Sequence, residues 1–161
     1  MMLTGILTTQ QAYSSISWTT VFLVAGILPL GIALTKTNAA GIMADGIISV
    51  IGPFGTPALL AGLILLTMFL VQAMNGAAVA AVIGPIAINI AQQAGINPRA
   101  LTMGVALATS MAFITPLGHP VNILVMSPGG YKFRDFVKIG LPLVLILFVV
   151  LMIFLPIFWR F

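Results

Sequence analysis

Charged residues are scarce in this sequence, acidic ones above all. The 161 residues contain two aspartates, no glutamate and six lysines or arginines, so 5% of the chain is charged while 61% is hydrophobic. Soluble domains carry about 25% charged residues, and so few charges cannot cover a water-facing surface of this size. The scarcity excludes an ordinary soluble protein and indicates a chain that lies in lipid.

Cysteine is absent, which excludes disulfides and thiolate metal sites. The sequence also lacks an HExxH motif, paired carboxylates and a phosphate-binding loop, and Ser110 and His119 have no acidic third partner. The basic residues stand at the ends of apolar segments, where they set membrane topology, and do not form a nucleic-acid-binding patch. The sequence therefore predicts no enzyme, no cofactor and no nucleic-acid partner, with an intramembrane hydrolase as the third-ranked alternative.

Long apolar runs without period-2 alternation fill most of the chain, which predicts membrane helices rather than barrel strands. Residues 18–34 form the first predicted span and residues 139–158 the last. Over residues 38–52, apolar and polar side chains segregate to opposite helix faces, which predicts a helix lying in the membrane interface. The predicted fold class is an all-α polytopic membrane protein of about four spanning units.

Two further apolar segments are interrupted by polar or helix-breaking residues. The first covers residues 58–91 and breaks at 72–76; each half is short for a bilayer crossing, and together they are too long for one span. This pattern predicts a discontinuous helix or a re-entrant hairpin. The second segment has apolar runs over residues 100–114 and 121–126, separated by a break at 115–120, which predicts a discontinuous helix.

In secondary transporters such breaks meet near the membrane midplane, where helix N-termini bind anions and neutral oxygens hold the coupling cation. A simpler interpretation is that Gly and Pro only kink the helices, that small-residue rows such as Gly104, Ala108 and Ala112 only pack them, and that His119 bonds the broken backbone rather than a ligand or proton. Two breaks in one short chain favour a site. The predicted substrate-binding residues are Asn75, Gly76, Ala77, Thr115, Pro116, Gly118, His119 and Pro120. The predicted coupling-ion residues are Asn75, Ser110, Thr115 and Asn122, with no resident metal.

Three stretches resemble a known family. Residues 110–143 read SMAFITPLGHPVNILVMSPGGYKFRDFVKIGLPL, residues 27–40 read ILPLGIALTKTNAA, and residues 75–91 read NGAAVAAVIGPIAINIA. They resemble citrate and sulfate permeases of the divalent anion:sodium symporter family, within the ion transporter superfamily. The resemblance is closest to the bacterial branch that carries RCK-type regulatory domains, and TPLGHPVN followed by PGGYKFRDF is its most specific part.

The resemblance implies an elevator-type transporter for small anions, built from two inverted repeats that each supply a re-entrant hairpin and a broken helix. The family's Ser-Asn-Thr motif at the hairpin tip falls on Asn75, Gly76 and Ala77 when counted back from Pro85, and a shift of one residue aligns its Asn with Asn75. The motif's hydroxyl groups are missing in both alignments. The unwound stretch of the following helix maps to residues 115–122 without a gap.

We therefore predict that residues 1–161 are the C-terminal transmembrane repeat of an anion permease. As half of a permease, it would carry out cation-coupled transport of sulfate or a di- or tricarboxylate across the inner (plasma) membrane. Sodium is the expected coupling ion and the proton the alternative. The expected partners are the anion, the lipid bilayer, a missing N-terminal half or a full-length permease, and a second copy in a dimer. The alternative function is a non-transporting structural or regulatory membrane fragment.

The basic residues also predict the orientation of the chain. Lys132, Arg134 and Lys138 precede the last span and Arg160 follows it, so the positive-inside rule puts the loop before that span in the cytoplasm. Alkaline phosphatase fused after Phe161 should therefore be active, because it requires the oxidising periplasm to form its disulfides. A cytoplasmic reporter at the same position should be silent, and the opposite pair of results would reverse the orientation.

Overall fold

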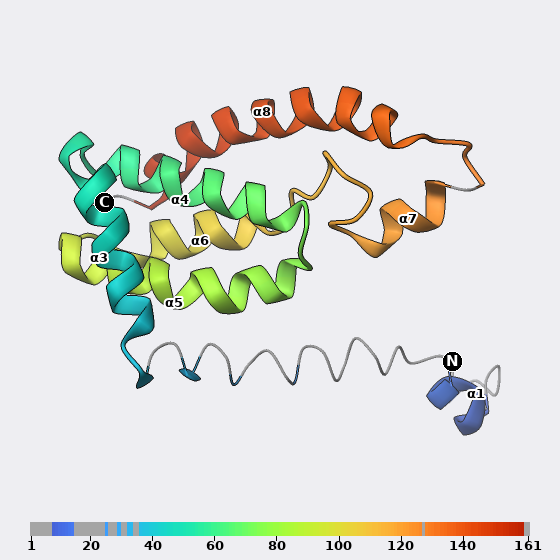
Figure 1. Ribbon diagram of the computed structural model, residues 1–161, viewed down its shortest axis with the longest axis horizontal. Coiled ribbons are helices and arrows are strands. Elements are labelled where there is room, and N and C mark those ends of the chain that lie inside the picture. The colour runs from blue at the N-terminus through green and yellow to red at the C-terminus, as the bar shows by residue number, and fades with distance from the viewer. Residues whose placement is uncertain are drawn as a thin grey trace.

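The computed structural model describes residues 8–14, 25, 29, 32–33, 36–126 and 128–159. Their regular secondary structure is helical, as predicted, and this part of the chain has no strand. Most of the first predicted span, residues 18–34, lies outside the described residues. The described helices are α1 (Thr9–Ser14), α3 (Ala39–Ile51), the 3-10 helix η1 (Gly52–Phe54), α4 (Thr56–Val71), α5 (Gly76–Ala94), α6 (Pro98–Ala108), α7 (Pro120–Met126) and α8 (Phe133–Phe158) (Figure 1).

Helices α4 and α5 form a hairpin whose ends are set by local hydrogen bonds. The Asn75 side chain caps α5 by accepting a hydrogen bond from the Ala77 nitrogen at 2.8 Å. Helix α5 ends at Gly95, whose φ of 67° is in the left-handed region that glycine adopts without strain. Because α5 folds back along α4 (Figure 1), the first interrupted segment is a helical hairpin and not one kinked helix.

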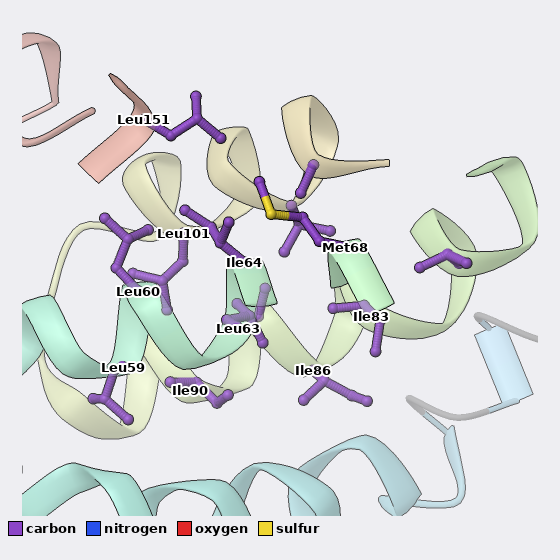
Figure 2. Close-up of a cluster of buried hydrophobic side chains, with 14 of the residues drawn as sticks. Leu59, Leu60, Leu63, Ile64, Met68, Ile83, Ile86, Ile90, Leu101 and Leu151 are labelled. Carbon is purple, nitrogen blue, oxygen red and sulfur yellow. The ribbon is translucent and has the colours of Figure 1, made fainter. Parts of the chain in front are cut away.

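Helix α6 packs against both arms of this hairpin and completes the core. Figure 2 shows the branched side chains that fill the space between the three helices, among them Leu60, Ile64 and Ile86, all fully buried. Gly104 of α6 lies where an added Cβ would be 3.1 Å from the nearest Leu60 atom and 3.2 Å from Ile64. The small-residue row on α6 is therefore a packing seam at Gly104, which brings α6 close to α4.

Helix α3 packs against α5, and its most buried residues are small. Ala40, Gly41 and Ala44 are buried, whereas Met43 and Val50 are 45% and 70% exposed. A helix is thus confirmed in this segment, over Ala39–Ile51; its fully buried residues are small, and Ile47, Ile48 and Ile51 are partly buried against the core. The position of α3 in the membrane interface stays a prediction.

Two helix boundaries differ from the sequence prediction. Helix α6 ends at Ala108 and not at Ile114, so the non-helical segment is longer than predicted and covers residues 109–119. Helix α8 begins before residue 139, because Lys132 and Asp135 cap its start: Asp135 Oδ2 accepts from the Lys132 nitrogen at 2.8 Å, and Lys132 oxygen accepts from the Asp135 nitrogen at 2.9 Å. The start of α8 is therefore set by capping hydrogen bonds, which the length of the apolar run does not reveal.

Helix α8 turns most of its apolar surface outward. Gly140, Val144, Leu151 and Leu155 are buried, while most of the other large apolar side chains along it are exposed. Within the described residues, α5 and α8 are the helices long and apolar enough to cross a membrane. Only 17% of the apolar window of α8 is buried, so this helix is unlike the core helix of a soluble protein and suits contact with lipid.

Substitution of one glycine in α8 should disturb the packing of this helix. A Cβ at Gly140 would collide with the carbonyl oxygen of Phe113, which belongs to backbone and cannot easily move. Gly140→Ala should lower the detergent-solubilised melting temperature by about 3–10 °C, since overpacking costs about 1–3 kcal/mol. Gly84→Ala is the matched control, because a Cβ there meets nothing within 4 Å. Equal melting temperatures for the two variants would contradict this packing.

Candidate substrate and ion site

The two breaks predicted from the sequence lie against each other. The hairpin tip between α4 and α5 contacts the non-helical segment that follows α6, and glycine permits the approach at two points. A Cβ on Gly118 would collide with the Val71 carbonyl oxygen, and a Cβ on Gly76 would be 2.6 Å from the Thr109 carbonyl oxygen. Side chains at these positions would push the two breaks apart.

Gln72 joins the two breaks through hydrogen bonds to backbone. Its Nε2 donates to the carbonyl oxygens of Met68 and Met111 at 2.9 and 3.0 Å. Its Oε1 accepts from the backbone nitrogens of Ile114 and Thr115 at 3.1 and 3.2 Å. An unpaired buried backbone group costs about 1–3 kcal/mol. Gln72 therefore supplies hydrogen bonds that the backbone of the unwound segment would otherwise make within a helix or to water.

Thr115 and Asn122 complete this network. The Thr115 hydroxyl donates to the Gln72 carbonyl oxygen, and Asn122 Nδ2 donates to the carbonyl oxygens of Ala112 and Thr115 at 2.8 and 3.4 Å. Among the described residues, no buried side-chain nitrogen or oxygen lacks a hydrogen-bond partner. The unwound segment is thus held from the hairpin on one side and from α7 on the other.

A cavity of about 260 Å³ lies beside this network. Its lining residues are Asn75, Gly76, Ala77, Thr109, Ser110, Gly118 and His119. All the predicted substrate residues of the hairpin tip are among them, together with Ser110, Gly118 and His119 from the second break. His119 Nδ1 also accepts a hydrogen bond from the Val121 nitrogen at 3.3 Å, as its simpler interpretation predicts.

The other predicted site residues lie outside this lining. Thr115 is half-buried and bonded to Gln72, Pro116 is buried, and Pro120 is the first residue of α7. Asn122 lines a different cavity of about 270 Å³, between α7 and α8. Of the predicted coupling-ion residues, the structure brings Asn75 and Ser110 to one cavity, and it places Thr115 and Asn122 in the adjoining network.

The polarity of the 260 Å³ cavity comes from helix ends and not from charged residues. No Asp, Glu, Lys or Arg is among its lining residues. The N-terminus of α5 reaches it at Gly76 and Ala77, and the C-terminus of α6 reaches it at Thr109. A helix N-terminus carries partial positive charge and a C-terminus partial negative charge. One cavity therefore offers an anion-favouring end and a cation-favouring end.

The site residues predicted from the sequence include neither Gln72 nor Thr109. The usable signal for Gln72 was its position, because an amide within an apolar segment needs hydrogen-bond partners. The identity of those partners depends on backbone that lies 39 to 43 residues further along the chain. Local sequence does not reveal them.

Comparisons with known proteins identify the family of this chain. The citrate transporter family, CitMHS, matches residues 1–161. This chain belongs to that family. It is 36% identical over 152 residues to the "Uncharacterized transporter YfbS" of Escherichia coli (strain K12), covering 94% of this chain and 25% of that protein. It is 29% identical over 143 residues to "Sodium/sulfate cotransporter 1" of Chlamydomonas reinhardtii, covering 88% of this chain and 16% of that protein.

The family is described by citrate transport, and these two relatives carry transporter names, not enzyme names. A third relative, "Uncharacterized transporter sll0640" of Synechocystis sp. (strain ATCC 27184 / PCC 6803 / Kazusa), is 36% identical over 147 residues, which are 91% of this chain and 24% of that protein. The chain thus spans about a quarter or less of the length of these relatives.

Loss of the Gln72 amide should loosen the contact between the two breaks. Gln72→Leu leaves two backbone N–H groups and the Met111 carbonyl oxygen without this partner. Each such group costs about 1–3 kcal/mol, so the melting temperature should fall by about 6 °C or more. Thr115→Val removes one hydroxyl hydrogen bond and should cause a smaller fall. If Gln72→Leu is no more harmful than Thr115→Val in detergent melting curves, Gln72 does not hold the segment.

Proposed function

We propose that this chain carries one half of the binding site of a cation-coupled transporter for small anions, and that the 260 Å³ cavity is its part of that site. This proposal rests on one observation. The N-terminus of α5 and the C-terminus of α6 meet in one cavity, and the residues that line it include no Asp, Glu, Lys or Arg. Relatives whose names specify sodium/sulfate cotransport support both the anion and the sodium. The substrate class we propose is sulfate or a di- or tricarboxylate.

The anion would lie at the start of α5. Asn75 fixes this end through its hydrogen bond with the Ala77 nitrogen, so the first turn of α5 keeps its direction toward the cavity. Backbone N–H groups at a helix start attract anions without an arginine or lysine. Gly76 and Ala77 present little side chain, which allows an anion to approach the backbone.

The coupling cation would lie in the same cavity, near the end of α6. Thr109 and Ser110 contribute oxygen atoms there, and neutral oxygens are the ligands that hard cations prefer. Thr115 and Asn122 would support the ion site from the adjoining network. Asn122 would act by holding the unwound segment in place, because its amide nitrogen donates to the Ala112 and Thr115 carbonyl oxygens. Sodium is the proposed ion and the proton the alternative.

The arrangement along α8 supports a re-entrant hairpin and an elevator-type repeat. Helix α8 has 26 residues and a length of about 39 Å, enough to cross a bilayer. The unwound segment contacts α8 at Gly140, partway along this helix, and α6 and α7 extend from that segment in opposite directions (Figure 1). A discontinuous helix in a chain with helices apolar enough to span the bilayer is what we expect of one transporter repeat.

The missing part of the site would come from the rest of a permease. Inverted-repeat transporters bind substrate between their two repeats, so each repeat supplies part of the coordination shell. The chain covers about a quarter of the Escherichia coli and Synechocystis relatives. We propose that residues 1–161 are the C-terminal repeat, that the N-terminal half completes the site in the inner membrane, and that the assembly is a dimer.

Uptake measurements test this proposal. Proteoliposomes with the chain alone should take up no sulfate or citrate under an inward sodium gradient, because half of the site is absent. Proteoliposomes with the chain inside a full-length permease should take up one of these anions. Robust sodium-driven uptake by the chain alone would disprove the half-site, and absence of uptake of any sulfate, di- or tricarboxylate by the full-length permease would disprove the function.

Two substitutions within the full-length permease test the cavity itself. Gly76→Ala should reduce uptake at least about 10-fold, because the methyl group would be 2.6 Å from the Thr109 carbonyl oxygen and would shift the start of α5. Gly84→Ala, in the same helix with nothing within 4 Å, should leave uptake unchanged.

Ser110→Ala should raise the sodium concentration for half-maximal uptake. A normal sodium dependence in Ser110→Ala would remove Ser110 from the ion site.

A further inference from the structure

The start of α8 carries positive charge that the proposed transport site does not use. Lys132, Arg134 and Lys138 are exposed and line a surface hollow of about 670 Å³, together with Phe133, Asp135 and Val137. None of these residues lines the 260 Å³ cavity. Three of the six Lys and Arg residues of the chain are thus gathered in one place, where the positive-inside rule predicts the cytoplasmic surface of the membrane.

The chain has almost no acidic side chain with which to neutralise this cluster. Its two carboxylates are Asp45, in α3, and Asp135. Asp135 lies among the three cations, but its Oδ2 is the hydrogen-bond acceptor that caps α8 at the Lys132 nitrogen. Three positive charges thus face one negative charge, and the N-terminus of α8 adds partial positive charge to the same region. The charge complement of this hollow is an anionic group.

An exposed apolar stripe continues from the cations along α8. Positions 134, 138, 141, 145 and 149 are spaced by three or four residues, so they follow one side of the helix. Leu141, Leu145 and Val149 are 47%, 54% and 54% exposed. The buried side of α8 is a different one, with Gly140 and Val144. A ligand with an anionic head and a long apolar tail matches both parts of this surface.

We propose that the start of α8 binds an anionic phospholipid. The headgroup phosphate lies between Lys132, Arg134 and Lys138, and one acyl chain follows Leu141, Leu145 and Val149 along the helix. A free phosphate would leave the apolar stripe unused, whereas a phospholipid satisfies the charge and covers the stripe. Juxtamembrane basic clusters attract anionic headgroups, and each Lys or Arg contributes about a five-fold increase in binding.

Native mass spectrometry of the purified chain in mild detergent tests this site. Dioleoylphosphatidylglycerol and dioleoylphosphatidylcholine have the same acyl chains but differ in headgroup charge. We expect one phosphatidylglycerol to be retained at concentrations at which phosphatidylcholine is lost. Lys138→Gln should weaken this retention about five-fold, and the triple variant K132Q/R134Q/K138Q should abolish the preference. The double variant K36Q/R99Q removes exposed cations elsewhere and should keep it.

Two further arms separate the lipid from other ligands. Leu145→Ser should reduce retention of phosphatidylglycerol more than Ile146→Ser does, because Ile146 is at least as exposed as Leu145 but lies off the stripe. Glycerol phosphate at the same concentration should not displace the lipid. Equal retention of both lipids, a preference that survives the triple variant, or displacement by glycerol phosphate would each overturn the proposal. A photocrosslinker placed at position 145 of a full-length permease gives one more test. Crosslinks to protein instead of lipid would also overturn the proposal.

Discussion

The structure depends on hydrogen bonds to the backbone of an unwound segment, because its N–H and C=O groups have no partners within a helix. In lipid, a peptide group outside a helix needs a protein partner or water, and each missing partner costs several kcal/mol. Gln72 supplies such partners by using both atoms of its amide on backbone from the second break. From the other side, the Asn122 amide nitrogen donates to the Ala112 carbonyl oxygen. These contacts allow residues 109–119 to stay non-helical beside the hairpin tip, and the candidate cavity exists because of them.

Close backbone approach is the second constraint, and it explains where glycine stands. Gly76, Gly118 and Gly140 each lie where a Cβ would meet a carbonyl oxygen of another segment. Gly84, by contrast, has open space around it. Glycine composition alone does not separate these cases. In a membrane protein, where apolar burial from water does little to drive helices together, such close contacts contribute a larger share of the packing energy.

The scarcity of charged residues is compatible with the proposed anion and cation because helix ends carry partial charges. The cavity has no Asp, Glu, Lys or Arg among its lining residues, yet the start of α5 favours an anion and the end of α6 favours a cation. Charged side chains are instead found where α8 begins, at the surface. A chain with 5% charged residues can therefore still belong to a family of anion transporters.

The sequence by itself determined the all-helical class, the membrane environment and the two breaks, because these follow from apolar composition and from helix-breaking residues that act locally. The same residues also carried the family resemblance. Tertiary structure alone decided that the first break is a hairpin, that α6 ends at Ala108, and which residues line the cavity. It also assigned Asn122 to a different cavity from Asn75 and Ser110. These features depend on contacts such as that between Gln72 and Thr115, across 43 residues of chain, and no local pattern encodes the partner of a side chain so far away.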